Sequence, residues 1–270
     1  MTSITKTFAV RPLSAALLFA LSAAMPLAAN AAPTGAAHAY DLSMNISVVG
    51  VGSLVVTPQA EVQHTPQIAA WSDADQVLSL DTGPGALRLT TGELNAVSQW
   101  IPGVTYHAVG SQASADNVNL SVLGLASANL LGLQAQRITA TAIVAGSCPP
   151  PSGRPVAEVP ALVEELVFAS SFDNGGLRPR GNAETPGLTI TALGTNIPGL
   201  PALPAPNTSV DLSGLGILGT TLILNEQVTG GDGVHNMTLS ANGLHLTMNV
   251  AGVITANVII AHADAAIACP

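Results

Sequence analysis

The chain has 270 residues and is poor in charge, with seven lysine and arginine residues against sixteen aspartate and glutamate residues, a formal net charge of −9. Binding to nucleic acid needs cations that displace counterions from phosphates, so this composition argues against a nucleic-acid partner and against anionic membrane surfaces. A chain of this length is long enough to form one domain, or two small ones, around a sizeable buried core.

Residues 1–31 have the layout of a secretory signal peptide. A weakly basic start precedes an apolar run at 13–24, and the small-residue site Ala29-Asn30-Ala31 predicts cleavage before Ala32; a second such site, Ala37-His38-Ala39, follows. A membrane anchor is the alternative, but the apolar run is shorter than the roughly 20 residues that a span needs. We predict a secreted protein, extracellular, periplasmic or at the outer cell surface, without an integral membrane span once the signal peptide is removed.

Residues 32–148 are predicted to form an N-terminal β half. Aliphatic residues alternate with Ser, Thr and Asn, most clearly in Leu42–Val49 and Val118–Val122, and this alternation is typical of half-buried antiparallel strands. Gly and Pro interrupt the runs at short intervals, as a sandwich or barrel requires. We therefore predict an all-β, antiparallel fold that is sandwich-like or barrel-like.

A Pro- and Gly-rich connecting insert is predicted at 149–185, with one short helix at Ala157–Ala169. Strand alternation resumes in residues 186–270, which are predicted to form a C-terminal β half. The clearest strands there are 188–192, 244–250 and 254–260.

The two β halves resemble each other weakly, and a duplicated β module would explain this. The alternative is that any two strand pairs punctuated by glycine look alike. The matching positions are Leu120-Ser-x-x-Gly124-Leu125 with Leu239-Ser-x-x-Gly243-Leu244, Gly132 with Gly252, and Cys148 with Cys269.

Cys148 and Cys269 are the two cysteines of the chain, and each stands at the end of a predicted strand and before a proline. In an exported chain, two cysteines predict a disulfide because the compartment is oxidising. The link would close a loop of about 120 residues and contribute on the order of 4–5 kcal/mol to stability. The alternative is two free buried thiols.

The sequence contains no assembled catalytic motif. There is no Gly-x-Ser-x-Gly elbow, and the six histidines show no His-Glu-x-x-His or similar metal spacing. His262 and Asp264 would project from one face of a strand and form a weak acid–base pair, although such pairs are more often structural. We predict no enzymatic activity, no metal and no cofactor.

Two loops are weak calcium candidates and two tryptophans are candidate glycan contacts. Asp73 with Asp75, and Asp232 in a Gly-Gly-Asp-Gly turn, could supply carboxylate oxygens to calcium, but Asp and Gly favour plain turns. Trp71 and Trp100 could stack on sugar faces, or they could fill the core as large rings more often do.

The segments PAPNTSVDLSGLGILGTTLILNEQ (204–227), ANGLHLTM (241–248) and ANVIIAHADAAIAC (256–269) resemble the choice-of-anchor P family. The segment from Ala39 and the strand that ends at Cys148 resemble the N-terminal half of that family. The resemblance implies a bacterial cell-surface or extracellular β-protein whose biochemical role is not defined. The matching positions are Asn207, Asn225, Glu226, Gln227, Asn242, Leu244 and His245.

These observations predict a non-catalytic exported protein with a structural or adhesive role, whose partner is a cell-surface glycan or protein. One alternative is a secreted hydrolase that uses His262, Asp264 or a nearby acid. Another is a glycan-binding module that reads sugars through Trp71 or Trp100.

Overall fold

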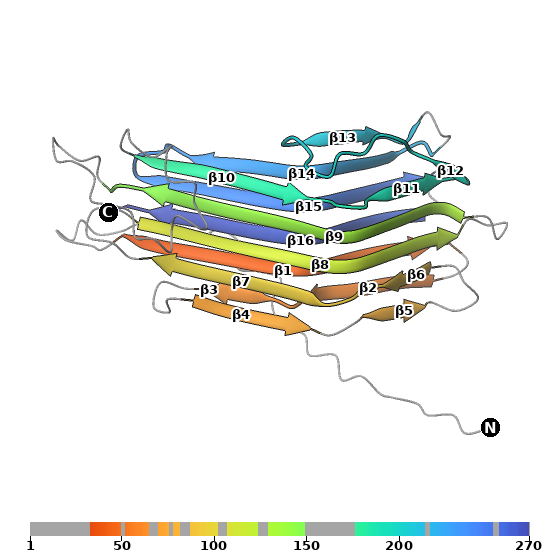
Figure 1. Cartoon of the computed structure of the whole chain (residues 1–270), viewed down its shortest axis with the longest axis horizontal. Coiled ribbons are helices and arrows are strands. Elements are labelled where there is room, and N and C mark those ends of the chain that lie inside the picture. Colours follow the sequence, from red (N-terminus) through yellow and green to blue (C-terminus); the bar gives the residue numbers. More distant parts are fainter. Residues whose placement is uncertain are drawn as a thin grey trace, which may run out of the picture. The chain divides into compact units, whose positions relative to one another are not determined.

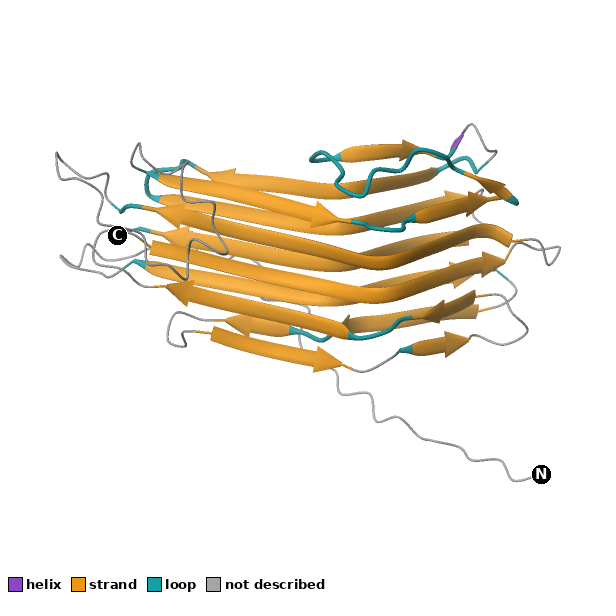
Figure 2. Cartoon of the chain, in the orientation of Figure 1, coloured by secondary structure: helices purple, strands orange, loops and turns teal. Residues whose placement is uncertain are grey.

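A computed structural model describes residues 33–49, 52–64, 70–75, 78–81, 87–101, 107–123, 129–148, 176–213, 217–250 and 254–269. Strands make up most of these residues (Figure 2), and no α-helix occurs among them. The described part of the chain accordingly holds no helix that is long and apolar enough to cross a membrane. All strand pairs are antiparallel.

The strands form two sheets, which we call sheet A and sheet B. The order in sheet A is β13 (Thr208–Asp211), β14 (Thr220–Gly231), β15 (Asn236–Val250), β16 (Ile254–Ala268), β1 (Thr34–Val48) and β2 (Gly52–Gln59), with β3 (Val62–His64) also on β1. The order in sheet B is β12 (Thr195–Asn196), β11 (Thr189–Ala192), β9 (Asn129–Gly146), β8 (His107–Leu123), β6 (Leu87–Thr90) and β5 (Ser79–Asp81). Sheet B also includes β10 (Leu177–Glu184) on β9, β7 (Leu94–Ile101) on β8, and β4 (Ala70–Asp75) on β7.

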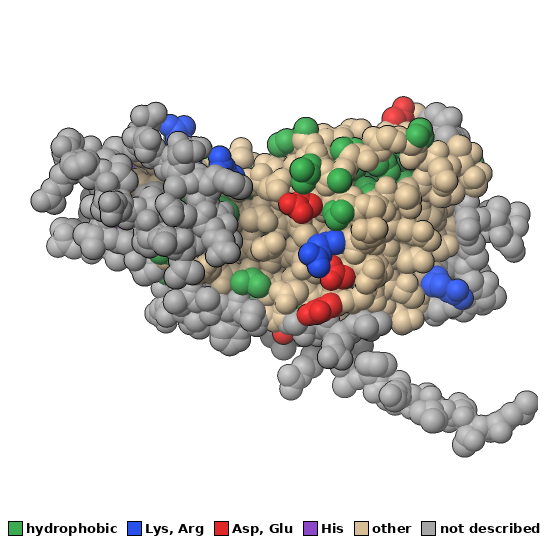
Figure 3. Space-filling view, viewed as in Figure 1, with side chains coloured by type: hydrophobic (Ala, Val, Ile, Leu, Met, Phe, Trp, Pro, Cys, Tyr) green, Lys and Arg blue, Asp and Glu red, His purple; other side chains and the backbone are tan. Residues whose placement is uncertain are grey.

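The two sheets pack face to face with one continuous apolar core between them. Figure 1 looks onto the outer face of sheet B, with sheet A behind it. In the space-filling view of the same face, few charged side chains are visible; one group of basic and acidic side chains lies near its middle, and others lie toward its ends (Figure 3). One charged pair on this sheet is Arg137 with Asp116, whose Nε and Oδ1 atoms lie 2.6 Å apart.

Four strands of sheet A exchange their inward and outward faces along one line, which we call the kink line. Asn225, Gly243, Ala261 and Asp41 occupy it, and the regular pairing of neighbouring strands stops on one side of these residues and resumes on the other. Asn225 and Ala261 have left-handed φ angles of 51° and 56°. Each of these strands leaves one residue unpaired at the kink line, and the register between neighbouring strands is the same on both sides of it, so every strand changes its alternation at the same place.

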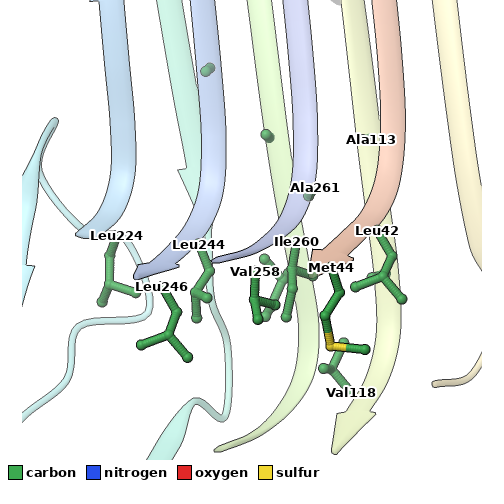
Figure 4. Packing of buried hydrophobic residues seen from close by; sticks show 14 of the residues in the cluster. Leu42, Met44, Ala113, Val118, Leu224, Leu244, Leu246, Val258, Ile260 and Ala261 are labelled. Carbon is green, nitrogen blue, oxygen red and sulfur yellow. The ribbon is translucent and has the colours of Figure 1, made fainter. Parts of the chain in front are cut away.

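The burial pattern records this exchange of faces. In β1 the buried side chains have odd numbers up to Ala39 and even numbers from Leu42 onward. In β16 they have even numbers up to Ile260 and odd numbers from Ala261 onward. Figure 4 shows the strands bending close to Leu224, Leu244 and Leu246.

On one side of the kink line the core is built from large aliphatic side chains, and on the other side mainly from alanine. The aliphatic side includes Leu42, Met44, Leu244, Leu246, Val258, Ile260, Val118 and Leu120. The alanine side includes Ala37, Ala39, Ala241, Ala263, Ala265, Ala113, Ala140 and Ala142.

Small side chains allow the two sheets to approach closely near the kink line. A Cβ atom on Gly243 of β15 would lie 2.7 Å from both Ile138 Cγ2 and Thr139 O of β9. Ser111 Oγ of β8 lies 2.8 Å from the carbonyl oxygen of Asp264 and 3.0 Å from that of His38. Its single hydrogen is shared between two strands of the opposite sheet.

A disulfide joins Cys148 to Cys269, with a Cα–Cα distance of 5.4 Å. Cys148 follows the end of β9 in sheet B, and Cys269 follows the end of β16 in sheet A. The backbone N–H of Cys269 also donates to the carbonyl oxygen of His235 at 2.6 Å. The predicted disulfide is therefore confirmed, and it links the two sheets.

The predicted all-β antiparallel class is confirmed, and of the two predicted architectures the sandwich is observed. Leu177–Glu184, which was assigned to the insert, forms β10 and pairs with β9. The predicted helix Ala157–Ala169 lies outside the described residues.

The two predicted halves do not correspond to the two sheets. β1 to β3 come from the first half, yet they lie in sheet A with β13 to β16. The residue-by-residue repeat is also not reproduced, because Leu120 lies near the end of β8 whereas Leu239 lies near the start of β15. The two long hairpins share their strand alternation and their linked cysteines, and this similarity produced the apparent repeat.

Candidate functional site: a histidine network on sheet A

The outer face of sheet A carries two histidines and a carboxylate from its central strand pair. In the pairing of β1 with β16, His38 lies opposite Asp264 and Tyr40 lies opposite His262. Residues of one parity in a strand face the same side. Because the odd-numbered side chains of this part of β1 and β16 fill the core, these four even-numbered side chains all point outward.

Contacts between polar atoms connect these groups to Glu61, which directly precedes β3, and to β14 and β15 in one continuous chain, which we call the histidine network. The atom pairs are Glu61 Oε1 with His38 Nε2 at 3.0 Å, His38 Nδ1 with Asp264 Oδ2 at 3.7 Å, Asp264 Oδ2 with His262 Nε2 at 2.9 Å, and His262 Nδ1 with Asn242 Oδ1 at 2.6 Å. The chain continues from Asn242 Nδ2 to Glu226 Oε2 at 2.7 Å, from Glu226 Oε2 to His245 Nδ1 at 2.7 Å, and from His245 Nε2 to Asn257 Oδ1 at 2.9 Å.

The kink line explains how Asn242 and His245 can share one network. Residues three apart in a regular strand face opposite sides of the sheet. The change of parity at Gly243 places Asn242 before the kink and His245 after it, with both side chains directed outward. Glu226, opposite Asn242 in β14, then accepts hydrogen bonds from both.

The network lies in a partly exposed position. The exposed fraction of the side chain is 12% for His262, 27% for His38 and 37% for Asp264. The Tyr40 ring stacks on the His262 ring, with centroids 4.4 Å apart and an interplanar angle of 22°. Tyr40 therefore holds one face of the His262 imidazole, while Asp264 remains open to solvent.

Hydrogen bonding determines the charge state of the central carboxylate. Burial raises the pKa of Asp264, but hydrogen bonds from His262, His38 and Ser240 and the charge of His262 outweigh it, so the pKa lies well below its usual range. Burial lowers the pKa of His38, but hydrogen bonds to Asp264 and Glu61 and their negative charges outweigh it, so this pKa is raised. Asp264 is thus a carboxylate at neutral pH.

Burial also raises the pKa of Tyr40, and the charges of Asp264 and Glu61 add to the increase. The Tyr40 hydroxyl therefore stays protonated at neutral pH.

Asp264 and the two histidines beside it could hold a metal ion. His38, His262 and Asp264 each offer one ligand atom, and these atoms all lie within 4.8 Å of one another. Two imidazoles and one carboxylate form a donor set that suits first-row transition metals.

Most of the residues that resemble the choice-of-anchor P family lie in or next to the network. Glu226, Asn242 and His245 belong to it, and Gln227 and Asn225 continue beside it on β14. Gln227 Nε2 donates to Asn225 Oδ1 at 2.7 Å, and Asn225 Nδ2 donates to the Pro204 carbonyl oxygen at 2.8 Å. The Gln227 backbone N–H donates to Asn207 Oδ1 at 2.8 Å. Six of the seven matching positions therefore lie in or beside the network, whereas Leu244 is buried in the core.

Trp100 is not available as a glycan contact, because only 5% of it is exposed and it lies in the core. Its ring stacks on that of His107, with centroids 5.9 Å apart and an interplanar angle of 8°. Burial lowers the pKa of His107. Trp71 lies in β4 opposite Ser98, and its side chain is outside the described part of the structure.

Among the described side chains, the calcium candidates do not form a cluster with other possible metal ligands. Asp73 is exposed in β4, and Asp75 lies at the end of the same strand with its side chain outside the described part. Asp232 closes the β14–β15 turn, where its Oδ1 accepts hydrogen bonds from the backbone N–H groups of Val234, His235 and Asn236. An Asp that satisfies its own turn in this way has a structural role.

Comparison with known proteins adds no family. No family model matches the chain, and no curated protein matches it. Among solved structures, a similar chain is the crystal structure of Ail, the attachment invasion locus protein of Yersinia pestis, with a TM-score of 0.18 and 3% identity over 87% of this chain and 99% of that chain. A TM-score this low does not show a shared fold, so the likeness carries no argument about function.

Sequence analysis identified His262 and Asp264 as a pair, and it missed His38, which contacts Asp264, and Glu61, which contacts His38. His38 is far from the pair in sequence and joins it only through the pairing of β1 with β16. The alternation of Ala37 and Ala39 with His38 and Tyr40 could have indicated it. In a strand, this pattern places the two alanines on one face and His38 and Tyr40 together on the other.

Proposed function

We propose that this chain is an exported bacterial β-sandwich protein with a structural or adhesive role at the cell exterior, and that it has no catalytic activity. The Cys148–Cys269 disulfide between the two sheets is the observation that carries the proposal. Disulfides persist in oxidising compartments and are rare in the cytosol. The signal-peptide layout of residues 1–31 agrees with that location.

The arrangement of the histidine network supports a non-catalytic role. A general base must have a nitrogen or oxygen within reach of the proton that it abstracts. His262 has both ring nitrogens directed at Asn242 and Asp264, and its ring face is covered by Tyr40. This imidazole is held in place rather than presented to a substrate.

The resemblance to the choice-of-anchor P family agrees with this proposal. The family positions Glu226, Asn242 and His245 hold β14 to β15 through side-chain hydrogen bonds. We therefore assign them to the maintenance of the sheet rather than to binding of a substrate.

Export is tested by expressing the chain with its own leader in a bacterial host and fractionating the cells. We expect the exported form to begin at Ala32 and to label with no maleimide unless it is first reduced. Leu17→Arg, in the middle of the apolar run, is the control, because a charge there should keep the chain in the cytosol. A wild-type chain that stays in the cytosol at full length, with two reactive thiols, contradicts the proposal.

The absence of catalysis is tested by a broad hydrolase screen of the purified protein. We expect no turnover by the wild type. Turnover that His262→Ala abolishes, in a variant with an unchanged unfolding transition, would establish the hydrolase alternative. A glycan array on the same protein tests the adhesive role, since binding to a defined cell-surface sugar would identify the partner.

A further inference from the structure

The hydrogen bonds of the histidine network determine which nitrogen of His262 carries a proton. Glu226 has a carboxylate oxygen 2.7 Å from Asn242 Nδ2, which fixes the orientation of that amide because a carboxylate only accepts. Asn242 Oδ1 must then face His262 Nδ1, and the 2.6 Å contact requires a proton on Nδ1. In the neutral imidazole, the lone pair of Nε2 therefore points at Asp264 Oδ2, 2.9 Å away.

The same constraint applies to His38. Glu61 Oε1 lies 3.0 Å from His38 Nε2, so a proton belongs on that nitrogen. The lone pair of His38 Nδ1 then faces the same oxygen, Asp264 Oδ2, at 3.7 Å. Two imidazole lone pairs and one carboxylate oxygen thus converge, and this arrangement needs either a proton at each imidazole or one shared cation.

We propose that His38 Nδ1, His262 Nε2 and Asp264 Oδ2 bind one divalent transition-metal ion of the zinc type. This inference goes beyond the proposed function and does not depend on the adhesive role. Zinc–nitrogen and zinc–oxygen bonds of about 2.0–2.2 Å place tetrahedral ligands about 3.4 Å apart. The ligand atoms already lie within 4.8 Å of one another, which is close to the spacing that one shared ion requires.

The surroundings match those of a metal-binding histidine pair. A histidine that binds a metal almost always donates its other ring N–H to a carboxylate, a carbonyl oxygen or water. Here Glu61 occupies that position for His38, and Asn242, oriented by Glu226, occupies it for His262. The shared Ser111 hydroxyl also fixes the backbone carbonyls of His38 and Asp264 from the opposite sheet.

Charge and donor type select the ion. With neutral imidazoles, the carboxylates of Glu61, Asp264 and Glu226 give the region three negative charges, of which a dication offsets two. Calcium and magnesium take oxygen ligands, whereas imidazole suits zinc, copper, iron and nickel. The bound ion would join the first strand of the sandwich, β1, to the last, β16.

The first experiment measures zinc binding by isothermal titration calorimetry, with the metal content measured by mass spectrometry after dialysis. The protein must carry no histidine tag. We expect one zinc per chain, affinity at least tenfold weaker in His38→Gln and Asp264→Asn, and a loss of about tenfold in Glu61→Gln. His235→Gln is the matched control, because His235 forms an exposed pair with Asp232 at 3.0 Å and has no third ligand in the described structure. We expect it to bind as the wild type does.

The second experiment uses the wild type alone, so it does not depend on whether a variant folds. Diethyl pyrocarbonate modification of each histidine is followed by mass spectrometry with and without zinc. We expect zinc to protect His38 and His262 and to leave His235 reactive. Absence of saturable binding at 0.1 mM zinc overturns the proposal, and so does protection of His235 alone or equal affinity in Asp264→Asn and wild type.

Discussion

Removal of the Cys148–Cys269 disulfide should cost this sandwich a large part of its stability. The link spans 121 residues of sequence. In the chain-entropy model, a loop of that length restricts the unfolded state by about 5 kcal/mol at 25 °C. Domains are stable by only about 5–15 kcal/mol, so the loss is comparable to the whole stability of many proteins. For a chain of this size we expect the melting temperature to fall by about 10–20 °C.

The assay is urea unfolding followed by tryptophan fluorescence, because Trp100 is buried in the core and reports its exposure. We compare the wild type with Cys148→Ser, Cys269→Ser and the double variant. Since either single change breaks the same link, the second should add little to the first, so the costs are strongly non-additive. The reduced wild type is a further control that changes no residue.

Two results would refute this reasoning. A double variant that loses less than about 1 kcal/mol would show that the unfolded chain is not restricted by the link as the loop model requires. Additive losses in the two single variants would show that the serines act through local packing and not through the disulfide.

Three further predictions concern packing and charge. Gly243→Ala should destabilise the protein by about 1–3 kcal/mol, since the new Cβ would meet Ile138 and Thr139 at 2.7 Å. The control is Gly132→Ala, which should change stability much less because the nearest neighbour of its Cβ would lie at 3.7 Å. Equal losses of stability in urea unfolding would contradict the prediction. Asp232→Asn should lower the melting temperature at pH 7, because backbone N–H groups and His235 hold the pKa of Asp232 below its usual range. This stabilisation is complete above the ordinary Asp pKa of about 3.9 and is lost as the pH falls. The melting temperatures of wild type and variant should therefore converge in acid, and a difference that stays constant with pH would contradict the prediction. Trp100→Ala should cost about 3–5 kcal/mol as a buried ring without weakening any glycan binding found on an array, and a loss of binding at unchanged stability would contradict it.

The strands were predictable because their alternation depends only on local sequence. Leu188–Ala192, for example, alternates Thr with aliphatic residues, and Thr189–Ala192 forms β11. Sequence pattern could also place Cys148 and Cys269 at strand ends, and export supplied the reason to pair them. These inferences need no knowledge of which strands are neighbours.

The pairing of distant strands was not predictable in the same way. β1 lies between β16 and β2 in sheet A, and only this order brings His38 opposite Asp264. Metal motifs such as His-Glu-x-x-His rely on ligands that are close in sequence. A site whose ligands come from the first and last strands of a sandwich has no such spacing, so the histidines looked scattered.

The kink line connects the core to the outer face and explains why the network lies where it does. Gly243 has room for no Cβ against sheet B, and the alanines beside it let Ser111 reach the carbonyls of β1 and β16. The change of parity at the same residue directs Asn242 and His245 to one side, where Glu226 accepts from both. The inner packing that brings the sheets together is thus also what orients the imidazoles on the outer surface. A substitution that separates the sheets at Gly243 should therefore disturb the histidine network and weaken zinc binding, even though Gly243 is not one of the proposed ligands.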